Sequence, residues 1–282
     1  MDKRKVAIFL AICFGISFVT AGVFHWSGGR LNSLGGQLLA SLYMFIPLVS
    51  VLLTQLITGE RPFSDIGLSF RFNRWWLLGW LVVMPLFAVL SVPLSALMPG
   101  ASLSTDSELL RQSLDAFEAQ GLPATPLAYL LITFLSALVA GITVNAVFAF
   151  GEEAAWRGFL YRCLGDMGFW KKSLLIGVIW GVWHFPLILM GHNYPDHPVA
   201  GVFFMIVFCT LLSPVMVFLR ERSGSVVVPA VAHGMMNALA ALPLLFVAGY
   251  NDLLCAPTGV AGFILLLVFD AAVYLLRKKQ AI

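Results

Sequence analysis

Two adjacent glutamates and an arginine stand at the end of a long apolar run, in the sequence GEEAAWRGF at residues 151–159. Ionisable side chains in apolar surroundings need a charged partner, a water-filled cavity or a chemical role. Glu153 and Arg157 are four residues apart, in the acid-before-base order that favours an ion pair on one helix face. Glu152 points about 100° away from Glu153 and has no such local partner. We therefore expect Glu153 and Arg157 to form a structural pair that holds the local electrostatics, and Glu152 to be available for chemistry.

Two of the five histidines stand inside apolar runs, where they could meet this acid. Asn237 follows His233 by four residues and shares its helix face, while His184 lies in a separate run. A single buried histidine usually serves packing, but two of them near an unpaired acid indicate acid–base chemistry. One cavity could be lined by Glu152, His184, His233 and Asn237. Asn145, seven residues before Glu152 on the same helix face, is expected to orient the acid or a neighbouring group.

The remaining histidines, His25, His192 and His197, fall in predicted outer loops. We interpret them as solvated loop residues. The sequence HNYPDHP also contains Asp196, so a surface metal site in this loop is a minor alternative.

The elements that must position these groups are membrane-spanning helices. Of the 282 residues, 60% are hydrophobic and only 11% are charged, against about 25% charged residues in an average soluble domain. Apolar runs of about 20 residues, the length of a spanning helix, occur eight times. They cover residues 6–26, 36–57, 75–97, 126–150, 172–190, 199–219, 226–248 and 258–276. The sequence therefore predicts an all-α integral membrane protein with about eight transmembrane helices.

Lysine and arginine residues gather on one side of these helices. With eight spans both termini share a side, and fifteen of the seventeen basic residues lie there, whereas only Arg30 and Arg111 lie opposite. Short cytoplasmic loops retain positive charge, so this asymmetry predicts that both termini are cytoplasmic. The net charge of +3 then reflects topology and does not indicate a nucleic-acid partner. We expect a multi-pass protein of the inner or plasma membrane.

The chain is interpreted as one continuous membrane domain, because no linker, repeat or long soluble insertion interrupts it. Residues 1–125 would form an N-terminal three-helix region, and residues 126–282 the region that carries the polar motifs. The outer connection 98–125 has its own helix signal, because Thr105 and Glu108 match a capping box. We expect this helix to lie at the membrane interface.

The first apolar run and the four cysteines do not change the interpretation of the chain as a helical membrane protein. An apolar stretch of about 20 residues exceeds the 7–15 that are usual in a signal peptide, so we expect a retained helix. The four cysteines show no spacing that indicates a disulfide framework or a paired metal motif.

Three short motifs occur in a recognisable order. They are EExxxR at Glu152, Glu153 and Arg157 with the continuation GFLY, an aromatic residue four before a histidine at Trp180 and His184, and HxxxN at His233 and Asn237. Over residues 150–240, the chain resembles the CPBP family of intramembrane proteases. This family includes type II CAAX prenyl endopeptidases and bacteriocin-processing or immunity relatives. Trp180 stands where phenylalanine is commoner, and we expect this to alter packing and leave the chemistry in place.

The resemblance implies peptide-bond hydrolysis inside the membrane. Glu152 would act as the general base on a water held with His184. His233 and Asn237 would stabilise the oxyanion that develops on the scissile carbonyl. The substrate would be a membrane-associated peptide or protein, and we expect the active site to face the cytoplasmic side.

No metal is required for this chemistry, since a glutamate can activate water without one. A zinc-dependent version of the same protease is the alternative, with Glu152, His184 and His233 as ligands. The HExxH motif of many zinc proteases is absent. The sequence therefore favours an enzyme without a cofactor.

Two functions of other classes remain open at this point. A non-proteolytic membrane scaffold or regulator would bind a partner protein and would not need Glu152 for its effect. A transporter would also place polar groups in the membrane, but a sequence repeat or paired broken helices would then be expected. The substrate, its prenylation and the oligomeric state cannot be read from the residues.

Overall fold

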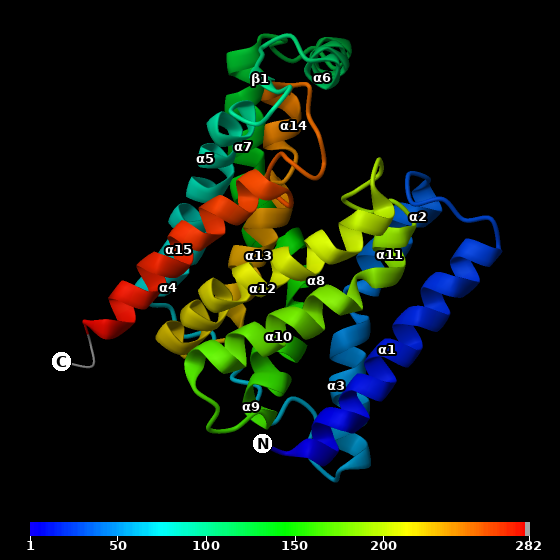
Figure 1. Cartoon of the computed structure of the whole chain (residues 1–282), viewed down its shortest axis with the longest axis vertical. Helices are drawn as coiled ribbons and strands as arrows, with labels where there is room; N and C mark the ends of the chain where they lie inside the picture. Colours follow the sequence, from blue (N-terminus) through cyan, green and yellow to red (C-terminus); the bar gives the residue numbers. More distant parts are fainter. Residues whose placement is uncertain (280–282) are drawn as a thin grey trace.

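The computed structural model describes residues 1–279, and their secondary structure is predominantly helical (Figure 1). A helical segment lies over each of the eight predicted apolar runs. In chain order these segments are α1 (Lys3–Trp26); α2 (Leu34–Tyr43) with α3 (Ile46–Ile57); α4 (Arg74–Leu77), the π-helix η1 (Leu78–Val83) and α5 (Met84–Ala96); α7 (Pro126–Ile142) with α8 (Val144–Glu153), the π-helix η2 (Ala154–Leu160) and α9 (Tyr161–Cys163); α10 (Phe169–Trp183) with α11 (Phe185–Leu189); α12 (Pro198–Ser223); α13 (Val227–Leu239) with α14 (Leu242–Phe246); and α15 (Val260–Lys278).

The helical membrane architecture is confirmed, whereas the count of eight spans stays a prediction. Within residues 1–279, six helical segments are long and apolar enough to cross a membrane, or up to seven if the pair Pro126–Ile142 and Val144–Cys163, bent by 45°, is one span. The predicted span 172–190 is divided into α10 and the short α11. Pro186 explains this division, because its ring cannot donate a backbone hydrogen bond and clashes with the preceding helical turn.

The connection between α5 and α7 also departs from a purely helical picture. The two-residue strands β1 (Ser102–Leu103) and β2 (Val247–Ala248) pair antiparallel, and α6 (Glu108–Ala119) follows β1. The side chain of Ser107 caps α6 by accepting a hydrogen bond from Leu110 N, so the predicted cap at Thr105 is two residues too early. The helix itself was correctly expected in this connection.

The molecule has two ends that differ in their loops. We call the end that holds the N-terminus, the α3–α4 loop, the α9–α10 loop and the α12–α13 turn the terminal end. The opposite end, with the connections 27–33, 97–125, 190–197 and 247–259, is the distal end. Figure 1 shows the N-terminus and the end of α15 low in the view, and β1 and α6 at the top. Arg30 and Arg111, the two basic residues predicted to lie opposite the termini, belong to the distal end.

Small residues allow the helices that carry the motifs to pack closely. A Cβ at Gly177 or Gly181 of α10 would lie only 2.5 Å from the backbone of α12, at Thr210 and Ile206 respectively. Likewise, a Cβ at Gly151 would lie 2.4 Å from the carbonyl oxygen of Met44. In membrane proteins, where burial in lipid supplies little drive for helix association, such close backbone contact is a main source of stability. The helix of Glu152 is therefore fixed against the N-terminal helices.

Candidate functional site

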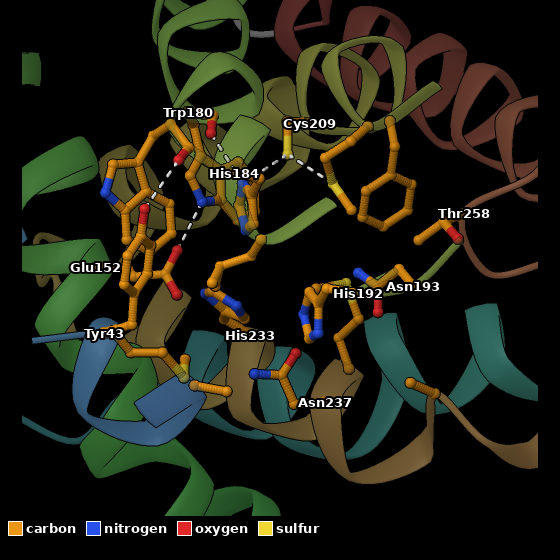
Figure 2. Close-up of a pocket in the computed structure, with 18 of the residues that line it drawn as sticks. Tyr43, Glu152, Trp180, His184, His192, Asn193, Cys209, His233, Asn237 and Thr258 are labelled. Carbon is orange, nitrogen blue, oxygen red and sulfur yellow. Dashed lines mark hydrogen bonds between the residues drawn. The ribbon is translucent and has the colours of Figure 1, made fainter. Parts of the chain in front are cut away.

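A cavity of about 310 Å³ lies where α2, α8, α10, α12 and α13 converge. Its polar lining comprises Ser41, Tyr43, Glu152, Trp180, Trp183, His184, His192, Asn193, Cys209, His233, Asn237 and Thr258. Figure 2 shows the labelled side chains among them, including Glu152, His184, His233 and Asn237, around one central space. The structure thus brings together the four predicted site residues Glu152, His184, His233 and Asn237, which come from three separate helical segments.

Glu152 forms part of the cavity floor. Its side chain is only 2% exposed, and its Oε2 accepts a hydrogen bond of 2.6 Å from the indole Nε1 of Trp180. Among the described residues, no basic side chain lies within ion-pair distance of Glu152, whereas its neighbour Glu153 has two such partners. The predicted division of the two glutamates, one paired and one not, is confirmed.

Glu153 is the centre of a fully buried cluster beneath this floor. Its Oε1 accepts a 2.9 Å hydrogen bond from Arg157 Nη1, as predicted, and also lies 2.9 Å from Nδ1 of His233. The guanidinium of Arg157 lies over the Trp180 ring, 4.4 Å from its centroid. The contact between Glu153 and His233 was not foreseen, because 80 residues separate them and no local spacing reports on such a contact.

His184 is oriented by the backbone of its own helix. Its Nδ1 lies 2.9 Å from the carbonyl oxygen of Trp180. A carbonyl can only accept, so Nδ1 carries the proton and Nε2 retains a lone pair. Trp180 therefore contacts both Glu152, through its indole, and His184, through its carbonyl.

The expectation that tryptophan at position 180 alters only packing is corrected by this geometry. A phenylalanine there would supply no hydrogen-bond donor to Glu152, whereas the Trp180 indole donates directly to the carboxylate. Hydrogen bonds to charged groups are the stronger ones. Trp180 is therefore part of the site as well as of the helix packing.

The two predicted asparagines have different surroundings. Asn237 lies one turn after His233 and lines the cavity, where it is exposed. Asn145, on α8, does not line the cavity, and its side chain makes no hydrogen bond with the rest of the described chain. The expected orienting contact of Asn145 with Glu152 or a neighbouring group is absent from the described chain, and the donor that Glu152 does have is Trp180 from α10.

His192, interpreted from the sequence as a solvated loop residue, lines the cavity instead. Its loop is folded against the α14–α15 connection: Tyr194 donates to the carbonyl of Thr258 at 2.8 Å, and His197 Nδ1 lies 2.6 Å from Asp252. Asp252 lies 55 residues after His197 in the sequence, and nothing local marks it as the partner of His197. The HNYPDHP segment is thus a structured wall, and its histidines do not converge on Asp196.

The donor set does not form a metal site in this arrangement. Within residues 1–279, no three histidine, cysteine, aspartate or glutamate side chains lie close enough to hold a metal ion. The Nδ1 atoms of both His184 and His233 are engaged, one by a carbonyl and the other by Glu153. Because Nδ1 contacts of this kind leave Nε2 of each histidine open and are also usual for zinc-bound histidines, the expectation of an enzyme without a cofactor stays a prediction.

These features define a multi-pass membrane protein with a cavity that combines a buried acid, two histidines and an asparagine. Residues 126–239, which carry all four, match the family model described as type II CAAX prenyl endopeptidase Rce1-like. The predicted resemblance is confirmed for this part of the chain.

A curated relative supports the same comparison over a shorter stretch. Over 44 residues the chain is 41% identical to CAAX prenyl protease 2 of Methanococcus maripaludis, which is 15% of this chain and 16% of that protein. The chain thus matches less than a fifth of the length of this relative. No solved structure matches the chain.

Proposed function

We propose that this protein is an intramembrane endopeptidase that hydrolyses a peptide bond with a glutamate-activated water. The observation that carries the proposal is the pairing pattern at the cavity floor. Glu153 holds the charged partners, whereas Glu152 faces the cavity with only a neutral donor. The match of residues 126–239 to an endopeptidase family supports the reaction class.

Glu152 and His184 would hold the water. The carboxylate of Glu152 accepts the proton of the attacking water, and the free Nε2 of His184 accepts a hydrogen bond from its second hydrogen. As the C–N bond breaks, Glu152 returns the proton to the leaving amine. Trp180 positions both groups, because it contacts each of them.

His233 and Asn237 would stabilise the oxyanion. Nδ1 of His233 faces the Glu153 carboxylate, so an imidazolium there would present its Nε2–H to the cavity. Such a cation, together with Arg157, would balance the charges of the two glutamates. One oxyanion donor typically contributes about 10²–10³-fold in rate.

The reaction would proceed without a metal, since the described donors do not converge on a three-ligand site. Full activity after dialysis against a strong chelator would support this. Loss of activity on chelation, restored by zinc alone, would overturn it.

The decisive experiment compares two acid-to-amide variants in detergent. Glu152→Gln should lose about 10²–10⁴-fold in cleavage of quenched fluorescent apolar peptides, the range expected for a general base. Asp270→Asn is the matched control, because Asp270 is a partly buried acid on α15 that does not line the cavity. Full activity of Glu152→Gln would sink the assignment. A scaffold function would be favoured if Glu152→Gln still restored a deletion phenotype.

A further inference from the structure

The cavity opens toward the distal end of the molecule. Glu152 and Trp180 at the floor are 2% and 1% exposed, whereas Asn193 and Asn237 are exposed. The loop residues that line the cavity, His192, Asn193, Pro257 and Thr258, all come from the distal connections 190–197 and 247–259. No described residue of the terminal-end loops lines it.

The terminal end is closed behind the floor by ionic contacts. Glu60 accepts hydrogen bonds from Lys5 Nζ at 2.7 Å and from Arg162 Nη2 at 2.6 Å, which joins α1, the α3–α4 loop and α9. Asp2 N donates to Cys163 O at 2.8 Å. Between this end and the cavity lie the fully buried side chains of Trp156, Arg157 and Phe159. The terminal side thus presents ion pairs and packed side chains behind Glu152, and none of its described loop residues belongs to the cavity lining.

The distribution of lysine and arginine assigns the two ends of the molecule to the two faces of the membrane. Arg30 and Arg111 are the only lysine or arginine residues of the distal connections. The remaining lysine and arginine residues lie in the terminal-end loops or in the parts of the helices next to that end. By the positive-inside rule the terminal end is cytoplasmic. We propose that the cavity is entered from the non-cytoplasmic face of the membrane, opposite the termini, and not from the cytoplasm as the depth of the motifs alone led us to expect.

The lining indicates what would enter by this route. Apart from the site residues, the walls are neutral and include Met44, Leu187, Met205, Phe208 and Met236. Among the described lining residues, Glu152 is the only aspartate, glutamate, lysine or arginine. Flexible methionine side chains fit apolar groups of varied shape. The substrate class would be an apolar peptide segment whose end emerges on the non-cytoplasmic face. This part of the inference rests on the proposed function, whereas the side of access does not.

Single-cysteine labelling tests the side of access without any activity measurement. The reporter is Ser41→Cys, a near-isosteric change on the cavity wall. Cys209, which also lines the cavity, is replaced by alanine in the background, and the other three native cysteines are buried. Asn32→Cys reports the distal end and Lys171→Cys the terminal end, because both positions are exposed. Full-length variants are treated with a membrane-impermeant maleimide in right-side-out and inverted vesicles.

We expect Ser41→Cys and Asn32→Cys to be labelled in right-side-out vesicles only, and Lys171→Cys in inverted vesicles only. Labelling of Ser41→Cys from the same side as Lys171→Cys would overturn the proposal, and so would labelling from both sides. Absence of labelling at Ser41→Cys from either side, while both controls react, would show that no aqueous path exists and would equally overturn it. A labelled cavity with a fully active Glu152→Gln variant would contradict the proposed function alone.

Discussion

The floor and the mouth of the cavity are built on different principles. At the floor, Glu152 and His233 are 2% and 4% exposed, and each has a specific hydrogen-bonding partner. At the mouth, His192, Asn193 and Asn237 are neutral polar groups with more exposed side chains. Groups held in fixed geometry serve reaction steps that tolerate little displacement. Polar groups at an accessible rim contribute chiefly to binding and orientation.

This difference predicts where substitutions should act. Changes at the floor should lower kcat, because they disturb groups that act on the transition state, whereas changes at the mouth should mainly raise KM.

Glu153→Gln should have the greatest total effect. The substitution leaves Arg157 buried without its carboxylate and removes the partner of His233 Nδ1. Breaking a buried ion pair costs about 3–5 kcal/mol of stability, and loss of an oriented oxyanion donor about 10²–10³-fold in kcat. Thermal unfolding in detergent and peptide cleavage measure the two effects. Stability equal to the wild-type value would show that the buried cluster is not what holds α8 and α13 together.

Trp180→Phe should lower kcat and leave the fold intact. The aromatic packing is kept, but Glu152 loses its indole donor. A hydrogen bond to a charged group contributes about 1.5–3 kcal/mol, which corresponds to roughly a 10–100-fold loss.

The control for this variant is Trp183→Phe, since the Trp183 indole donates to Ser17 at 2.7 Å and not to Glu152. A pH–rate profile should shift in Trp180→Phe and not in Trp183→Phe. If the two variants behave alike, the indole of Trp180 has no special relation to the acid.

His192→Ala should raise KM by a few-fold at nearly constant kcat. The residue lines the mouth, and within the described chain its side chain forms no hydrogen bond or ion pair with the floor groups. Steady-state kinetics on an apolar peptide separate the two parameters. A fall in kcat as large as that of Trp180→Phe would contradict the division between floor and mouth, and would make His192 part of the chemistry.

Glu60→Gln should have the smallest effect, confined to stability. Burial raises the pKa of Glu60, but the hydrogen bonds from Arg162 and Lys5 outweigh it, so that the pKa is lowered from its ordinary value of 4.5. A carboxylate with a lowered folded-state pKa adds stability at neutral pH that is lost as the pH falls through the folded pKa.

As the pH falls from 4.5 through the lowered folded-state pKa of Glu60, the wild-type protein should therefore lose more thermal stability than Glu60→Gln. Asp65→Asn is the control, because the Asp65 side chain is 80% exposed and pairs with Arg162 only at 3.6 Å. An identical pH dependence in wild type and Glu60→Gln would exclude the ionic closure as a contributor to stability.

Local spacing predicted the features of the site that lie within one helix. The Glu153–Arg157 pair follows from a four-residue separation, and the shared face of His233 and Asn237 follows from the same rule. The apolar runs located the helical segments for the same reason, since a spanning helix has a fixed length.

Contacts between distant segments could not be predicted in this way. Trp180 reaches Glu152 across 28 residues, and Asp252 reaches His197 across 55. Both depend on how two helices or loops are placed against each other, which one sequence does not specify. The position of His192 was missed for the same reason, because a loop that folds inward has the composition of a loop that faces water.

The close approach of α7 and α13 has a consequence for motion. A Cβ at Gly234 would lie 2.4 Å from the carbonyl oxygen of Gly141 and 2.6 Å from Ala146 N, so α13 is locked onto the bend between α7 and α8. The proposed base on α8 and the proposed oxyanion donors on α13 would then travel as a single rigid body. Any widening of the cavity that admits a polypeptide would then come from walls other than α8 and α13, while the groups on these two helices keep their spacing.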